Sequence, residues 1–168
     1  MIKRILLGLG DKPHSEAKVG YALDIAKTHQ AKVTGVTVLD VDRLMHVGPV
    51  PLGGGGAAEE LREHRMQECQ AKIKETAAFF ESSCNGAGVK FKILHEEGSP
   101  FDRLVDLAAF EDLVLFGLHG VFDYGIVTDR PEKPIDLLIR FITAGVRPIL
   151  AVSDSYRPIQ RVLVAYSG

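Results

Sequence analysis

The sequence is poor in cysteine, and this limits the redox or metal chemistry that it can support. Its two cysteines, Cys69 and Cys84, lie 15 residues apart on one predicted helix. At about 1.5 Å per helical residue they are roughly 22 Å apart, too far for a disulfide. No other ligand accompanies either cysteine at metal-binding spacing. We therefore expect two buried, apolar thiols and no metal site.

Long apolar runs and an excess of one charge are also missing. No stretch approaches the roughly 18 apolar residues of a membrane span, and the run at 5–9 is too short for a signal-peptide core. Lys and Arg number 20 against 22 Asp and Glu, and no segment concentrates positive charge. We therefore expect a cytoplasmic protein that binds neither membranes nor nucleic acid.

Catalytic signatures are absent as well. The sequence contains no Gly-x-Ser-x-Gly elbow and no Gly-x4-Gly-Lys-(Ser or Thr) loop. The four glycines at 53–56 lack the Lys that a phosphate-binding loop needs, so they are interpreted as a mobile linker. The six histidines are scattered over separate segments. We predict no catalytic residues and a protein that is not an enzyme.

The 168 residues suffice for one ordinary domain, and strand-like and helix-like segments alternate along it. This alternation indicates an α/β fold with parallel strands and right-handed crossovers. We expect an open five-stranded parallel sheet in the order 3-2-1-4-5, with helices on both faces and a ligand crevice at the carboxyl ends of the first and fourth strands. Strands are predicted over residues 3–9, 32–39, 89–95, 112–116 and 148–152, and helices over 14–30, 59–83, 100–110 and 134–144.

Local signals fix some of these boundaries. Ser99 and Pro100 are a typical cap and first residue of a helix, whose residues Leu104 and Phe110 we expect to face inward. The stretch Asn-Gly-Ala-Gly at 85–88 is expected to end the long helix. Residues 41–58, rich in Gly and Pro, are expected to lack regular structure.

The end of the chain resembles its beginning. Residues 161–168, Arg-Val-Leu-Val-Ala-Tyr-Ser-Gly, repeat the pattern of residues 4–11, Arg-Ile-Leu-Leu-Gly-Leu-Gly-Asp, at an offset of 157 residues. Such an offset is typical of tandem repeats. We therefore expect one domain over 1–153, with 154–168 forming a linker and the first strand of a second, truncated copy. The alternative is a chance sixth strand.

Five stretches, taken in order, resemble universal stress proteins of the UspA-like type: 4–7, 14–17, 97–100, 112–120 and 147–152. The match at 112–120, Asp-Leu-Val-Leu-Phe-Gly-Leu-His-Gly, carries the most weight. The resemblance implies an adenine-nucleotide alpha-hydrolase-like fold and the N-terminal domain of a tandem member. It also implies dimerisation through the edge strand at 148–152.

Many members of that family bind ATP through the pattern Gly-x2-Gly-x9-Gly-(Ser or Thr), whose backbone N–H groups approach phosphate. Gly117 and Gly120 match the first half, but Arg130 and Pro131 stand where Gly-Ser is expected, so the motif is degenerate. The acidic position after the first strand is matched imperfectly by Asp11. The candidate cofactor-binding residues implied by the resemblance are Gly10, Asp11, Val38, Gly117, His119 and Gly120.

Each of these residues has an expected role. The backbone of Val38 would meet adenine, Gly10 and Asp11 would approach the nucleoside, and His119 would position the loop. We expect a non-enzymatic stress-response domain that works through a homodimer, a second stress-protein domain or a small ligand. The alternative is an ATP-binding switch or weak ATPase that uses the loop of Gly117 and Gly120, with Mg.

Overall fold

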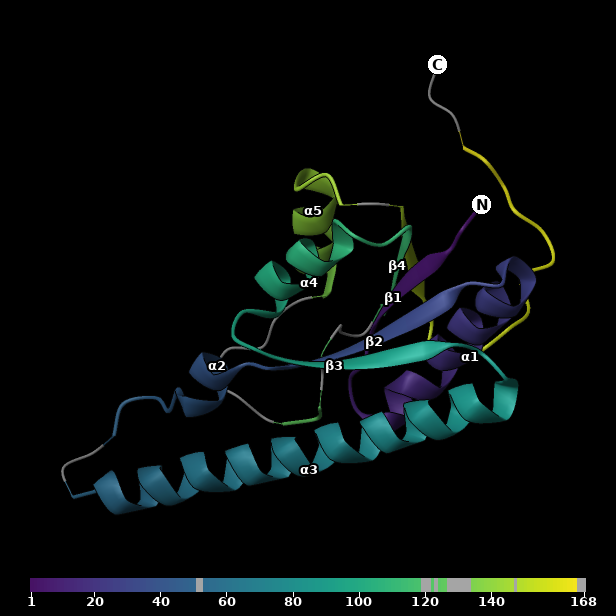
Figure 1. The fold of residues 1–168 in the computed structure, drawn as a ribbon. Helices are drawn as coiled ribbons and strands as arrows, with labels where there is room; N and C mark the ends of the chain where they lie inside the picture. Colours follow the sequence, from purple (N-terminus) through teal and green to yellow (C-terminus); the bar gives the residue numbers. More distant parts are fainter. Residues whose placement is uncertain (51–52, 119–121, 123, 127–133, 147, 166–168) are drawn as a thin grey trace.

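The five strands form one parallel sheet in the order β3-β2-β1-β4-β5, which confirms the predicted topology. Figure 1 shows the sheet with its helices in a computed structural model. The residues that the structure describes are 1–50, 53–118, 122, 124–126, 134–146 and 148–165. The strands are β1 (Arg4–Gly8), β2 (Lys32–Leu39), β3 (Phe91–Glu97), β4 (Leu113–Gly117) and β5 (Ile149–Val152).

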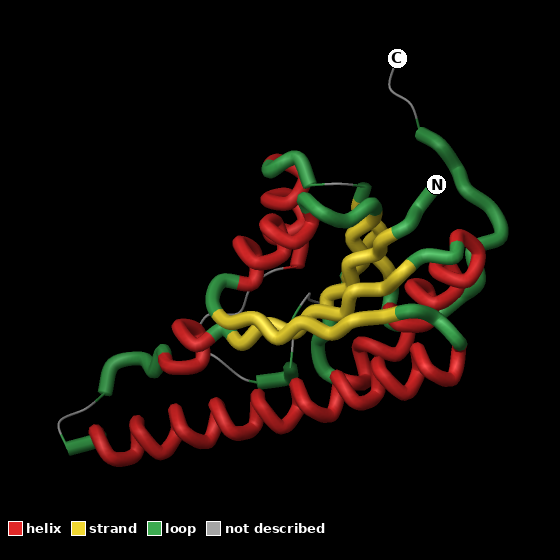
Figure 2. Tube along the Cα trace, in the orientation of Figure 1, coloured by secondary structure: helices red, strands yellow, loops and turns green. Residues whose placement is uncertain are grey.

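Helices cover both faces of the sheet, as predicted. Helices α1 and α3 lie on one face and α4 and α5 on the other, while the short α2 lies beside the first half of α3 (Figures 1 and 2). Their bounds are α1 (Lys12–His29), α2 (Val41–Met45), α3 (Gly55–Ala87), α4 (Pro100–Ala108) and α5 (Pro134–Thr143). No helix among the described residues is long and apolar enough to cross a membrane.

Successive side chains of β1 point to opposite faces of the sheet and so contribute to two apolar clusters. Ile5 and Leu7 point into the cluster under α1 and α3, and Leu6 points into the cluster under α4 and α5. Both faces of a central parallel strand are buried, so its sequence is a continuous apolar run. On the first face Gly35 leaves room for Phe80 of α3, because a Cβ built on Gly35 would lie 2.7 Å from the phenyl ring.

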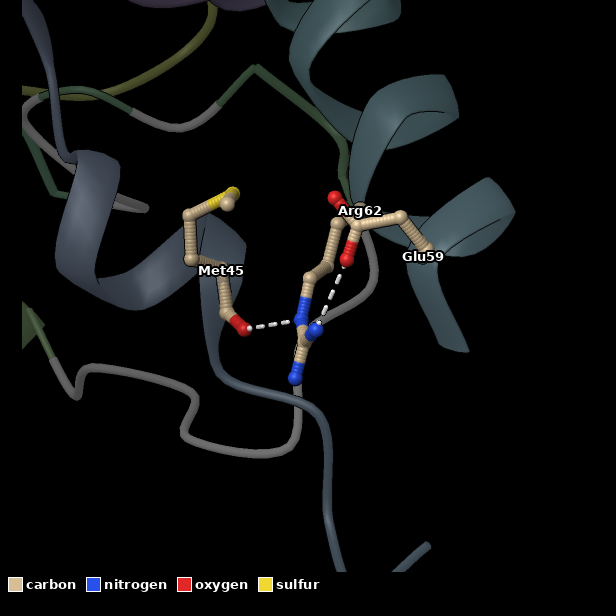
Figure 3. A network of polar contacts seen from close by, with 3 residues as sticks. All are labelled: Met45, Glu59 and Arg62. Carbon is tan, nitrogen blue, oxygen red and sulfur yellow. Dashed lines mark hydrogen bonds and ion pairs between the residues drawn. The ribbon is translucent and has the colours of Figure 1, made fainter. Parts of the chain in front are cut away.

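The expectation that 41–58 lacks regular structure is wrong at both ends. Residues 41–45 form α2, with the Asp40 side chain accepting from the Arg43 N–H at its start, and α3 already begins at Gly55. Figure 3 shows how α3 holds this segment: Arg62 bonds to the Met45 carbonyl at 3.1 Å and to Glu59 at 3.0 Å. One turn further, Arg65 donates to a second carbonyl of the segment, that of residue 46, at 2.9 Å. Such donors satisfy carbonyls that a helix end leaves unpaired.

Other boundaries were predicted with mixed success. Ser99 caps α4, and Gly88 ends α3 in the left-handed conformation, both as expected. However, residues 85–87 are still helical, α1 starts two residues early, at Lys12, and β3 runs over 91–97 instead of 89–95. Phe110 was expected inside and is 68% exposed, because α4 ends before it at Ala108.

The two cysteines lie buried on α3, as predicted. Cys84 packs among the residues under α1, whereas Cys69 belongs to the cluster on the opposite face. One helix reaches both clusters because its 33 residues span about 50 Å. The first half of α3 therefore lies near the carboxyl ends of the strands.

The segment after β5 packs against α1. The Tyr156 ring lies edge-on to Tyr21 with centroids 5.0 Å apart, and its hydroxyl bonds to Asp24. The Tyr21 hydroxyl in turn accepts from the N–H of Arg157 at 3.0 Å. Further along, residues 161–165 form no strand and are exposed, because no strand of the described chain pairs with them. That 154–168 begins a second domain stays a prediction.

Candidate functional site

The crevice was expected at the carboxyl ends of β1 and β4. A bridging contact lies instead on the other side of β1, where β1 and β2 stop pairing directly. The last direct bond runs from the Leu9 N–H to the Val36 carbonyl at 2.9 Å. The next bond of a parallel ladder would join the Val38 N–H to the Leu9 carbonyl. Instead, the Tyr124 hydroxyl accepts from the Val38 N–H at 3.2 Å and donates to the Leu9 carbonyl at 3.1 Å. A side chain from the segment after β4 therefore bridges the two strand ends.

The Tyr124 side chain is buried in this position. It is 5% exposed and belongs to the apolar cluster that also contains Phe122 and Phe116. Burial raises the pKa of Tyr124 above its usual range, and the hydrogen bond from Val38 acts in the opposite direction. The phenol is therefore protonated at neutral pH and remains able to donate to a carbonyl.

Two charged side chains flank the next residue, Gly125. Its φ is +68°, and a Cβ built on it would lie 3.1 Å from Nζ of Lys72 and 3.6 Å from Oδ2 of Asp11. The positive φ and the crowding both favour glycine at this position. Because Lys72 comes from α3 and Asp11 from the turn after β1, two elements hold the residue that follows Tyr124.

The structure brings the predicted residues of the first two strands to this edge. The carbonyl of Gly10 accepts a bond from the buried Ser15 hydroxyl at 3.2 Å, which fixes the turn into α1. Asp11 lies beside Gly125. Val38 is 1% exposed, and its N–H is engaged as described above.

Gly117 lies at the same edge, as the last residue of β4 and opposite Val152 of β5. The N–H of Leu118 then donates to the Val152 carbonyl at 2.9 Å, so the chain stays on the sheet for one more residue. The two other predicted residues, His119 and Gly120, lie outside the described residues.

The thiol nearest this region in the fold has no nucleophilic character. Cys69 shares the apolar cluster of Tyr124, and burial raises the pKa of its thiol to about 11, although the charge of Lys72 acts to lower it. A thiol with that pKa is protonated at neutral pH and unreactive. Among the described residues, no three His, Cys, Asp or Glu side chains are grouped as metal ligands.

The backbone N–H that was expected to meet adenine is already bonded in this conformation. The backbone of Val38 was expected to meet adenine, but its single N–H already bonds to Tyr124. The Leu9 carbonyl accepts from the same hydroxyl. A base that used either group would first have to displace the Tyr124 side chain.

Comparison with known sequences identifies the family of this fold. The sequence model for the universal stress protein family matches residues 1–121. The chain belongs to the universal stress protein family. No curated protein matches the sequence.

Solved structures of universal stress proteins share the fold. The hypothetical protein MJ0577 has a TM-score of 0.65 and 17% identity, with 91% of this chain and 96% of that chain covered. A universal stress protein in complex with cAMP has a TM-score of 0.58 and 18% identity, covering 92% and 98%. One from Archaeoglobus fulgidus in complex with dAMP has a TM-score of 0.55 and 13% identity, covering 90% and 97%.

Two residues near the bridging contact of this universal stress protein were missed in the sequence. Neither Tyr124 nor Lys72 was named among the candidate residues. A signal for the first was present, since Phe122 and Tyr124 are two aromatic residues two positions apart in a stretch rich in polar residues. Nothing in the sequence indicates that Lys72 would lie beside Gly125.

Removing the Tyr124 hydroxyl should destabilise the fold. In Tyr124→Phe the buried Val38 N–H and Leu9 carbonyl lose their partner, which we expect to lower the free energy of unfolding by about 1–3 kcal/mol. Urea unfolding followed by circular dichroism measures this loss. The control Tyr156→Phe also removes a tyrosine hydroxyl but at an exposed contact with Asp24, and should change stability less. Equal effects of the two substitutions would contradict the role of the bridge.

Proposed function

We propose that this universal stress protein domain has a regulatory or stress-response role and acts through dimerisation or small-ligand binding, not through catalysis. The observation that carries the proposal is the bridge of Tyr124 between Leu9 and Val38. It engages the Val38 N–H, the backbone group that the family resemblance assigns to adenine. The degenerate second half of the glycine motif, with Arg130 and Pro131, also favours it, since proline has no N–H for phosphate.

A second function, an ATP-binding switch or weak ATPase, has a specific observation in its favour. Solved universal stress proteins of the same fold are described in complex with cAMP and with dAMP. In this chain the loop of Gly117 and Gly120 would approach the phosphates, with Mg to neutralise their charge. This alternative requires Tyr124 to leave the Val38 N–H.

The dimer part of the proposal draws on the free edge of β5. Two carbonyls of this segment face β4. The Val152 carbonyl accepts from the Leu118 N–H, and the carbonyl of residue 148 accepts from the Val114 N–H. Because strand residues alternate, the backbone of Ile149 and Ala151 points away from β4. An edge strand with such groups is a template for pairing with another chain or domain. A row of exposed isoleucines on the neighbouring α5 adds apolar surface: Ile135, Ile139 and Ile142.

A nucleotide assay on the wild type tests the non-catalytic part. We expect millimolar Mg-ATP to release no phosphate and to leave the melting temperature within a degree or so of its unliganded value. A ligand at 100 times its dissociation constant would add about 2.7 kcal/mol, a shift of several degrees for a domain of this size. Phosphate release that Gly117→Val abolishes would contradict the proposal and favour the ATPase alternative.

Sedimentation velocity tests the dimer. We expect the wild type to sediment as a dimer and Ala151→Pro as a monomer, because proline removes an outward N–H of β5 without touching the bonds to β4. The control Ile159→Pro introduces proline into an exposed stretch outside the sheet and should remain dimeric. A monomeric wild type, or an Ala151→Pro variant that stays dimeric, would overturn the β5 interface.

A further inference from the structure

The backbone groups that Tyr124 bonds determine which ligands could replace its hydroxyl. The Leu9 carbonyl offers one acceptor, and the Val38 N–H offers one donor, side by side at the opening between β1 and β2. A phenol satisfies both groups because its oxygen accepts and its O–H donates. A ligand that replaces it must present a donor next to an acceptor in one plane. The amino group and adjacent ring nitrogen of adenine have this arrangement.

Tyr124 occupies the position between the Val38 N–H and the Leu9 carbonyl in the folded protein. Its ring is packed in the cluster of Phe122, and its hydroxyl forms both bonds that the position offers. The following residue, Gly125, is held between Lys72 and Asp11. The packing and hydrogen bonds of Tyr124 therefore keep its ring at the ends of β1 and β2.

We propose that Tyr124 is an intramolecular competitor of adenine nucleotides, so that this domain binds them only when Tyr124 has left the Val38 N–H and the Leu9 carbonyl. The proposal rests on the proposed function, because it assigns an adenine-type ligand to the small-ligand site. It also makes Tyr124 the residue that sets the affinity of the site. Binding is thereby coupled to the position of the segment around Gly125.

The competition has a quantitative consequence. When the binding-competent state is a fraction of the molecules, the apparent dissociation constant rises by the inverse of that fraction. An occupant present in about nine molecules of ten therefore weakens binding about tenfold. Removing the ring abolishes this effect, whereas removing the hydroxyl alone leaves a packed ring without its two bonds.

Titration calorimetry with AMP on the full chain tests the proposal. We expect Tyr124→Ala to bind AMP at least about tenfold more tightly than the wild type, with Tyr124→Phe between the two. The matched control Tyr156→Phe removes a hydroxyl of the segment after β5, which bonds to Asp24 of α1, and should bind like the wild type. Circular dichroism establishes that each variant is folded.

A folded Tyr124→Ala variant that binds AMP no more tightly than the wild type, or not at all at millimolar AMP, would overturn the proposal. If that variant does not fold, Tyr124→Phe is used instead, and an AMP affinity no higher than that of the wild type would overturn the proposal. Failure of this proposal and failure of the proposed function give different results. ATP hydrolysis by the wild type would contradict a non-catalytic role and leave the competition intact, whereas unchanged AMP affinity without hydrolysis would contradict the competition alone.

Discussion

The separation of β1 and β2 after Leu9 is the constraint around which this domain is organised. The two strands pair in parallel up to this point. There the backbone groups of Leu9 and Val38 lose their direct bond and lie in a buried place, where unpaired polar groups are costly. The Tyr124 hydroxyl satisfies both groups with one oxygen. The same bridge stabilises the fold and closes the site.

The long helix α3 and the segment around Tyr124 depend on each other. The middle of α3 places Cys69 in the cluster of Tyr124 and Lys72 beside Gly125, and its second half packs Phe80 and Cys84 under the sheet. Arg62 extends this role by holding the end of α2. The helix thus joins the core to the part of the molecule where ligand binding is expected.

The sheet and the chain order were predictable because their signals are local. A continuous apolar run marks β1, Ser99 and Pro100 mark the start of α4, and Gly88 marks the end of α3. Helix α2 was missed although Asp40 is a local signal for the start of a helix. The bond from Arg62 to its last carbonyl comes from a residue far along the chain, which no local pattern encodes. The glycines of the first turn of α3 were likewise misjudged, because a helix of 33 residues offsets the weak propensity of two glycines.

The candidate site was only half predictable for the same reason. Gly10, Asp11, Val38 and Gly117 were implied by the resemblance to universal stress proteins, and they lie at or after the carboxyl ends of β1, β2 and β4. That Tyr124 would cross to the ends of β1 and β2 depends on packing with residues far along the chain. Sequence reasoning named residues at these strand ends, but not the tyrosine that contacts two of them.

Hydrogen exchange of the Val38 amide, followed by NMR, tests the central claim most directly. If the Tyr124 hydroxyl holds this N–H, the Val38 amide should exchange about tenfold more slowly in the wild type than in Tyr124→Phe, since one such bond is worth about 1 kcal/mol or more. The Val33 amide, which bonds to the Lys90 carbonyl, reports the loss of global stability in Tyr124→Phe, and the Val38 amide should gain more in exchange rate than this loss alone explains. Equal exchange of Val38 in the two proteins would contradict the account.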